Sequence, residues 1–76
     1  MKNFYVIEIQ NNADGTSGNI VTGYEGRTES ETAYLSTRAA AAVSSVLIHT
    51  VVWMDNKGNV IEKKSYVHPV PEQAAE

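Results

Sequence analysis

The residues that could carry acid–base or nucleophilic chemistry are two histidines, His49 and His68, with carboxylates and hydroxyls scattered around them. A serine or threonine nucleophile needs a neighbouring base and an acid that orients this base. The spacing of the histidines from Asp14 and Asp55 indicates no such triad. His49 interrupts an apolar segment, which is typical of a hydrogen-bonded core or interface histidine; a functional base or ligand-binding group is the alternative. We therefore expect no catalytic residues and no enzyme activity.

A second set of residues has the chemistry to bind a planar anion. Arg27 and Arg38 are the only arginines, and a guanidinium suits bidentate contacts with phosphate or carboxylate. The rings of Tyr24 and Trp53 could stack on such a ligand. The competing interpretation is that the arginines form surface ion pairs and the rings pack in a sheet. The candidate ligand-binding residues are Tyr24, Arg27, Arg38, His49 and Trp53.

The segment from Asn11 to Asn19 reads NNADGTSGN and is rich in turn-forming residues. It lacks the lysine and the following helix of a phosphate-binding loop, and it has one aspartate where a calcium loop needs several oxygen ligands. The chain also has no cysteine. We expect a connecting loop, a candidate rim for a site between subunits, and neither metal nor cofactor.

These residues must be positioned by five expected elements. Alternating β-branched and aromatic residues predict strands, and a short loop rich in Asn and Gly separates the last two of them. The order is ββαββ, an α+β two-layer sandwich with one helix on a four-stranded, mainly antiparallel sheet. The expected ranges are 4–10, 20–25 and 46–54 for the first three strands, 60–67 for the fourth, and 29–45 for the helix.

The expected helix begins with a capping box, because Glu31 follows Thr28 at the required spacing. Winding it at 100° per residue separates two sectors. We assign one sector to the sheet: Leu35, Ala39, Ala42, Val43 and Val46. The opposite sector carries no charge, which favours contact with another subunit, although the high helix propensity of alanine is the alternative reason. This expected oligomer interface consists of Ala33, Thr37, Ala40, Ala41 and Ser44.

The small size of the chain also favours assembly into an oligomer. The chain has 76 residues, which predicts one domain over residues 1–68 and a frayed tail over 69–76. So small a core usually needs a disulfide, a metal or a partner subunit. The segment 46–54 is apolar on both faces, and one helix covers only one of them. We expect a homo-oligomer.

Charge and hydropathy limit the other partners. A net charge of −3 provides no broad basic surface, so nucleic acid is an unlikely partner. No apolar run is long enough to span a bilayer, and the first residues lack the features of a signal peptide. We expect a soluble protein of a bacterial cytoplasm.

Four stretches, YVIEIQNNADGTSG, AYLSTRAAAAVSSV, HTVVWMDNKGNVIE and the closing His68, carry a resemblance that spans nearly the whole chain. They resemble a family of small uncharacterised proteins encoded by phages and prophages of Gram-positive gut bacteria. The resemblance implies an accessory protein made in the bacterial host. Within that context we expect a non-catalytic homo-oligomer that acts by binding, for example an anti-defence sponge that sequesters a nucleotide-derived immune signal. The alternative is a protein–protein interaction module that inhibits a host factor or forms part of the phage particle.

Overall fold

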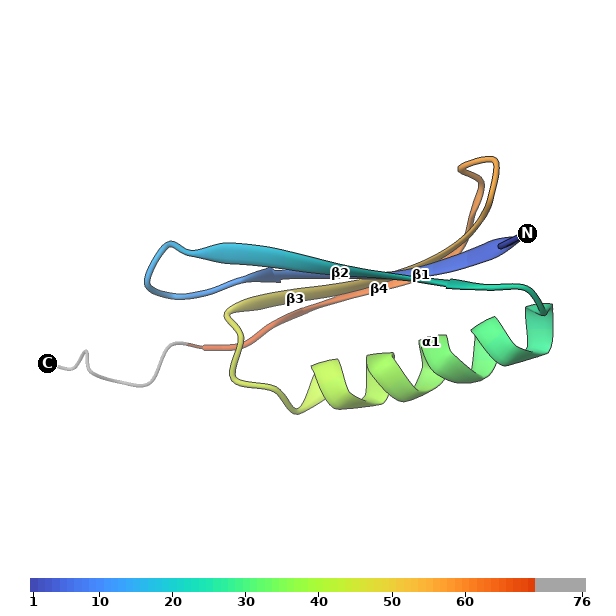
Figure 1. The fold of residues 1–76 in the computed structure, drawn as a ribbon. Coiled ribbons are helices and arrows are strands. Elements are labelled where there is room, and N and C mark those ends of the chain that lie inside the picture. The colour runs from blue at the N-terminus through green and yellow to red at the C-terminus, as the bar shows by residue number, and fades with distance from the viewer. Residues whose placement is uncertain (70–76) are drawn as a thin grey trace, which may run out of the picture.

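The computed structural model describes residues 1–69 and confirms the expected α+β fold with the order ββαββ (Figure 1). Residues 70–76, most of the expected tail, lie outside the described part. The elements are β1 (Phe4–Asn11), β2 (Ser17–Tyr24), α1 (Arg27–Ala42), β3 (Ile48–Asp55) and β4 (Val60–Val67).

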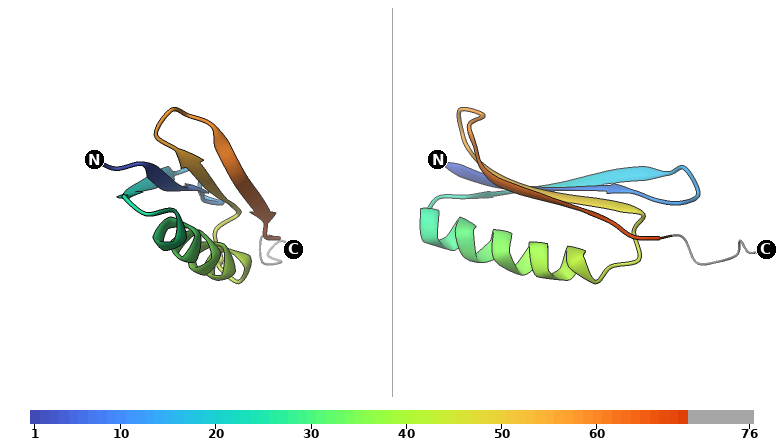
Figure 2. Two further views of the ribbon diagram at one scale, coloured as in Figure 1. Left: turned by 90° about the vertical axis from the view of Figure 1, so that its right-hand side faces the viewer. Right: turned by 180° about the vertical axis from the view of Figure 1, so that it is seen from behind.

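The four strands form one antiparallel sheet in the order β2-β1-β3-β4. The two central strands are therefore β1 and β3, and the edges are β2 and β4. Figure 2 shows α1 lying along one side of this sheet, while no other element of residues 1–69 covers the opposite side. Antiparallel sheets tolerate a face without a covering layer, but such a face is normally polar.

The core lies between α1 and the two central strands. Val6, Val51 and Trp53 point from the sheet toward the helix and are buried there against Tyr34 and Ala41. The rings of Tyr34 and Trp53 stack, with centroids 5.8 Å apart. Two aromatic side chains thus supply much of the volume that a small-residue helix lacks.

The one polar group of the Trp53 ring is also accommodated in this core. Its Nε1–H donates to the hydroxyl of buried Ser30 at 2.9 Å, and this hydroxyl donates to the carbonyl of Arg27 at 2.8 Å. Burial of the indole therefore leaves no unpaired donor behind.

The expected orientation of the helix was wrong. Leu35 and Val43, which we assigned to the sheet, are 46% and 85% exposed, and Ala39 is exposed too, while Ala42 and Val46 are half-buried. The side that packs on the sheet carries Ser30, Tyr34 and Ala41. Tyr34 is fully buried at the centre of the core and stacks on Trp53, so this contact determines the orientation of the helix.

The helix also begins and ends earlier than expected. Its N-cap is Gly26 without a side-chain cap, so the expected capping box does not form. Thr28 lies inside the first turn, where its carbonyl accepts a hydrogen bond from the Thr32 hydroxyl. The helix ends at Ala42 rather than Ser45 because the Ser44 side chain is engaged by β3.

The first hairpin is tighter than expected, because β2 starts at Ser17 rather than Ile20. The connection is short, and Gly15 takes a φ of +93°, a conformation suited to glycine. Asp14 accepts hydrogen bonds from the Thr16 hydroxyl and the Thr16 N–H, and these bonds lower the pKa of its carboxyl group. The loop is thus held by its own side chains.

The second hairpin turns around Gly58, whose φ of +88° lies in the left-handed region that favours glycine. Asp55 accepts hydrogen bonds from the backbone N–H groups of Lys57 and Asn59 and from the Asn59 amide. The bonds from Asn59, then that from Lys57, lower the pKa of the Asp55 carboxyl group.

This turn gives a pH prediction. Since folding lowers the pKa of Asp55 below its unfolded value of about 3.9, its stabilisation is complete above that pH and is lost as the pH falls through the folded-state pKa. We expect Asp55→Asn to melt a few degrees below the wild type at pH 6, with the gap closing toward pH 2. Thermal melts across this range check it, and a gap that widens in acid would contradict the assignment.

Candidate functional site

The sheet presents one uncovered surface, which we call the open face. It consists of the strand residues that alternate with those pointing to α1. The pairing register places them in four rows across the sheet, running from the β3–β4 turn to the β1–β2 loop. The rows are Gly23, Tyr5, Met54 and Val60; Val21, Ile7, Val52 and Lys63; Asn19, Ile9, Thr50 and Ser65; and Ser17, Asn11, Ile48 and Val67.

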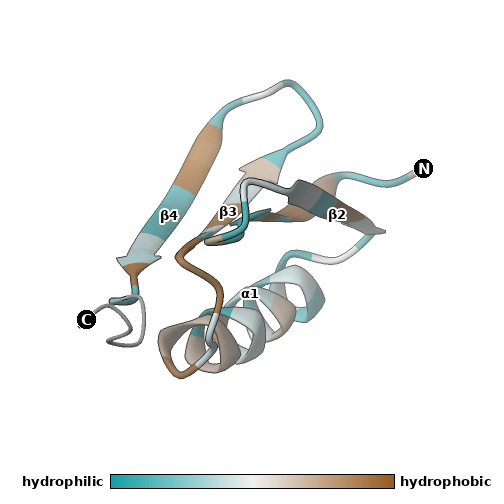
Figure 3. Ribbon diagram, turned by 90° about the vertical axis from the view of Figure 1, so that its left-hand side faces the viewer, coloured by the Kyte–Doolittle hydropathy of each residue, from teal (hydrophilic) through white to brown (hydrophobic). Residues whose placement is uncertain are grey.

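The open face is apolar over most of the two rows nearest the β3–β4 turn. Several of its side chains are exposed beyond what a strand in a covered sheet would show, including Ile9 at 38% and Val60 at 53%. The hydropathy colouring of Figure 3 shows apolar stretches at both ends of β4, with a hydrophilic stretch between them. A contiguous apolar patch of this kind marks an interaction surface more often than a solvent-facing one.

Charge is divided unequally between the two faces of the sheet. Lys63, on an edge strand, is the one charged residue among the strand residues of the open face. The face toward α1 carries Glu8, Glu62 and Lys64. The side chain of Lys2, which precedes β1, lies close to Gly23 on the open face. A Cβ atom added at Gly23 would lie 3.0 Å from Lys2 Cγ. The open face is thus the less charged one, the reverse of a sheet that faces water on one side.

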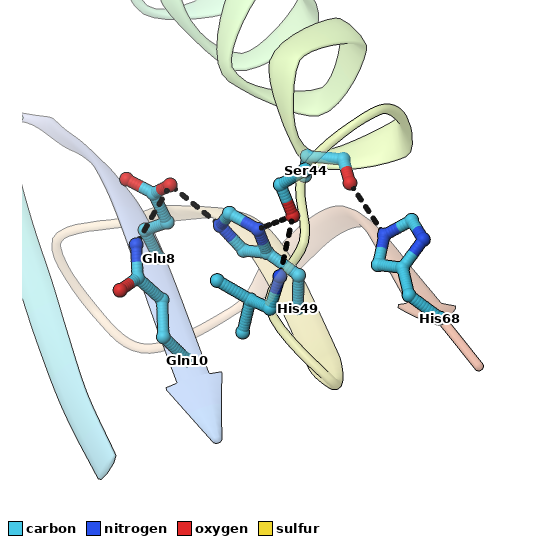
Figure 4. Close-up of polar contacts among 7 residues, drawn as sticks. Glu8, Gln10, Ser44, His49 and His68 are labelled. Atoms are coloured by element: carbon cyan, nitrogen blue, oxygen red, sulfur yellow. Dashed lines mark hydrogen bonds and ion pairs between the residues drawn. The ribbon is translucent and has the colours of Figure 1, made fainter. Parts of the chain in front are cut away.

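A buried polar network lies at the opposite side of the sheet, near the end of α1 (Figure 4). His49 is buried, and its Nε2 lies 2.6 Å from the Glu8 carboxylate, while its Nδ1 lies 2.8 Å from the Ser44 hydroxyl. A carboxylate only accepts, so Nε2 carries the proton. Gln10 also donates to Glu8, at 3.4 Å, and the Val46 N–H donates to Ser44 at 3.4 Å.

This network brings together a hydroxyl, an imidazole and a carboxylate, which the sequence did not indicate because Glu8 is 41 residues away from His49. The order of groups is that of an activated serine. Ser44, however, directly follows the C-terminal turn of α1, where the backbone carbonyls of Ala40 and Ala41 carry partial negative charge. Partial negative charge at this position opposes the oxyanion that a serine nucleophile would generate. We interpret the network as a link between the helix end, β1 and β3.

A second histidine ties the same region to β4. His68 donates from Nε2 to the Ala41 carbonyl at 2.9 Å, and its backbone N–H donates to the Leu47 carbonyl at 2.7 Å. Its ring stacks on Tyr66. His68 therefore connects the end of the helix to the last strand.

The candidate ligand-binding residues do not converge on one site. Trp53 is only 3% exposed, with Arg27 5.1 Å above its ring, and Tyr24 packs against the same core. Arg38 pairs with Glu62 at 2.9 Å and lies over the Tyr34 ring. His49 belongs to the polar network. Arg38 is thus ion-paired, Arg27 lies over the Trp53 ring, and the rings of Tyr24 and Trp53 are packed in the core, as the competing interpretation expected of packed rings.

The expected interface residues of the helix lie mainly against the chain's own sheet. Ala41 is fully buried in the single chain, so its assignment to an interface was wrong, while Ala33, Thr37 and Ser44 are partly buried. Only Ala40 is exposed. The absence of charge in this sector reflects contact with the sheet of the same chain.

Within residues 1–69 there is no group of three or more side chains suited to hold a metal ion, and no helix long and apolar enough to cross a membrane. No cavity is found in this part of the chain. Comparisons with protein families, with curated proteins and with solved structures find no match for the chain.

Proposed function

We propose that this protein acts by binding, as a small non-catalytic interaction module whose contact surface is the open face of its sheet. One observation carries the proposal: Tyr5, Ile7, Val52 and Met54 form an apolar centre on the two middle strands, and no element of residues 1–69 covers it. A face with this composition stabilises the protein only when another surface removes it from water. An accessory role in a phage or mobile element agrees with such a module.

A photo-crosslinking amino acid at Ile9 tests this proposal in bacterial cells that produce the protein. Ile9 lies on the open face and is exposed in the single chain, so the probe would contact whatever covers the face. We expect a crosslinked protein species from position 9. The matched control is the same probe at Ala40, which is exposed on the helix, and there we expect none. Equal crosslinking from both positions, or none from position 9, would contradict the proposal.

Sequestration of a nucleotide-type ligand is the second candidate, and a different set of residues favours it. Lys64 Nζ lies 5.6 Å from the centroid of the Tyr66 ring, and the stacked pair of Tyr66 and His68 lies beside it. A cation beside two stacked rings has the chemistry to hold a planar anion. A thermal-shift screen with cyclic dinucleotides and ADP-ribose derivatives tests this candidate, because a ligand of the native state raises the Tm. No shift, with the Ile9 crosslink present, would leave protein binding as the function.

A further inference from the structure

We infer that the partner of the open face is a second copy of this chain, and that the two copies stack their sheets face to face as a two-fold sandwich. The inference rests on the proposed function and names the occupant of the same surface. Face-to-face packing of two sheets about 10 Å apart buries both inner faces in one core. Each copy would then have a layer on both sides of its sheet, α1 on one and the partner's sheet on the other.

The size of the open face fits a dimer of this kind. The strands have eight residues each. At about 3.4 Å per residue and about 4.8 Å between strands, the face measures roughly 27 by 19 Å. Two such faces bury roughly 1,000 Å² in projection, which reaches the lower bound for a specific interface of about 1,000 Å². Side chains that stand out from the sheet add to the accessible area that is buried.

The distribution of charge favours a second copy as well. Each chain has a net charge of −3, so two copies repel unless their acidic groups lie away from the contact. None of the strand residues of the open face is acidic. Lys63 lies on the edge strand β4, where a lysine side chain can extend its ammonium group past the rim of a sandwich into water. The interface therefore buries no acidic group, and its lysines, Lys63 and the Lys2 side chain beside Gly23, lie at the two edge strands.

The rows of the open face also select the orientation of the two copies. The end near the β3–β4 turn is apolar, with Tyr5, Met54 and Val60, whereas the end near the β1–β2 loop carries Asn11 and Ser17. A two-fold axis parallel to the strands places like ends together, apolar on apolar and polar on polar. An axis across the strands would place apolar side chains on polar ones. We expect the first arrangement, with β1 of one copy over β3 of the other.

Two variants of equal charge test the interface. Val52→Glu places a carboxylate at the centre of the open face and directly across from Lys63, a pairing that a single folded chain tolerates. Ala40→Glu adds the same charge to the exposed side of α1. By light scattering we expect twice the chain mass of 8.3 kDa for the wild type and Ala40→Glu, and the mass of one chain for Val52→Glu. Circular dichroism shows whether each variant is folded.

If Val52→Glu does not fold, Ile7→Thr serves as the second variant. It keeps a β-branched residue on the same face, and we expect weaker dimerisation.

The orientation of the two copies is tested by a spin label on Lys57→Cys, a single site because the chain has no cysteine. Lys57 lies in the β3–β4 turn, so like ends together bring the two labels near each other, and the crossed arrangement separates them by about one further strand length, roughly 27 Å.

The outcomes separate this inference from the proposed function. If the wild type is a monomer and the probe at Ile9 crosslinks to a different protein, the partner is not a second copy. The proposed function, binding through the open face, then stands. A monomeric wild type without any crosslink overturns both. A dimer that Ala40→Glu dissociates and Val52→Glu leaves intact places the contact on the helix and overturns the inference, and a long distance between the labels overturns the orientation.

Discussion

Replacing Tyr34 with alanine is expected to lower the free energy of unfolding by about 3–5 kcal/mol, as large-to-small substitutions of buried aromatic residues do. The side chain is fully buried, stacks on Trp53 and determines which side of α1 faces the sheet. The loss equals most of what a core of this size supplies. Urea denaturation followed by circular dichroism measures it, and we expect most of the Tyr34→Ala protein to be unfolded at 37 °C.

Tyr34→Phe is the control for this prediction. The Tyr34 hydroxyl is buried and has no hydrogen-bond partner among residues 1–69, and burial raises its pKa. Removing an unpaired buried hydroxyl costs no hydrogen bond and relieves its desolvation. We expect Tyr34→Phe to be as stable as the wild type or more stable. A loss as large as that of Tyr34→Ala would show that the hydroxyl, rather than the ring, holds the helix.

The second large effect is expected at His49. His49→Ala would remove both hydrogen bonds of the ring and leave Glu8 in a mostly buried position with only the long bond from Gln10. The penalty for such an unpaired carboxylate, together with the lost packing, is about 2–4 kcal/mol. Chemical denaturation at pH 7 measures this loss of stability.

Glu8→Gln is the matched comparison, because a glutamine oxygen still accepts from His49 Nε2. We expect it to cost less than His49→Ala, and the double variant Glu8→Gln/His49→Ala to cost less than the sum of the two single changes. Strict additivity would mean that the two side chains do not interact in solution.

The fold could be predicted from the sequence because its signals are local. Alternation in 4–10 and 46–54 marked the two central strands, and the turn around Gly58 marked the second hairpin. The ββαββ order then left one economical arrangement, a sheet with a helix on one face. Element boundaries shifted by up to three residues, as with β2 and the helix end, where side-chain hydrogen bonds rather than propensity decide.

The facing side of the helix could not be predicted in this way. A helix of small residues has only a weak preference for one side, so a single large side chain, Tyr34, decides which side faces the sheet. Its partner Trp53 was not known to lie opposite, because that contact joins the helix to β3 and depends on the packing of the whole sheet. The burial of Ala41 in the chain's own core was missed for the same reason.

The open face could be predicted from the sequence only in part. The apolar residues on both faces of β3 indicated that one face would lack a helix, and the open face confirms this. The contribution of β1, β2 and β4 to that face required the register of the strands. The contact between Glu8 and His49 also required it, because a separation of 41 residues carries no periodic signal.

The central claim, that the open face is covered by another copy in solution, is tested most directly by the reactivity of a thiol placed on it. The chain has no cysteine, so Ile9→Cys and Ala40→Cys each present a single thiol, and both positions are exposed in one chain. We predict that the thiol at position 9 is alkylated much more slowly than the thiol at position 40 at high protein concentration, and that it gains reactivity on dilution as the dimer dissociates. Equal alkylation rates for the two thiols at every concentration would contradict the account.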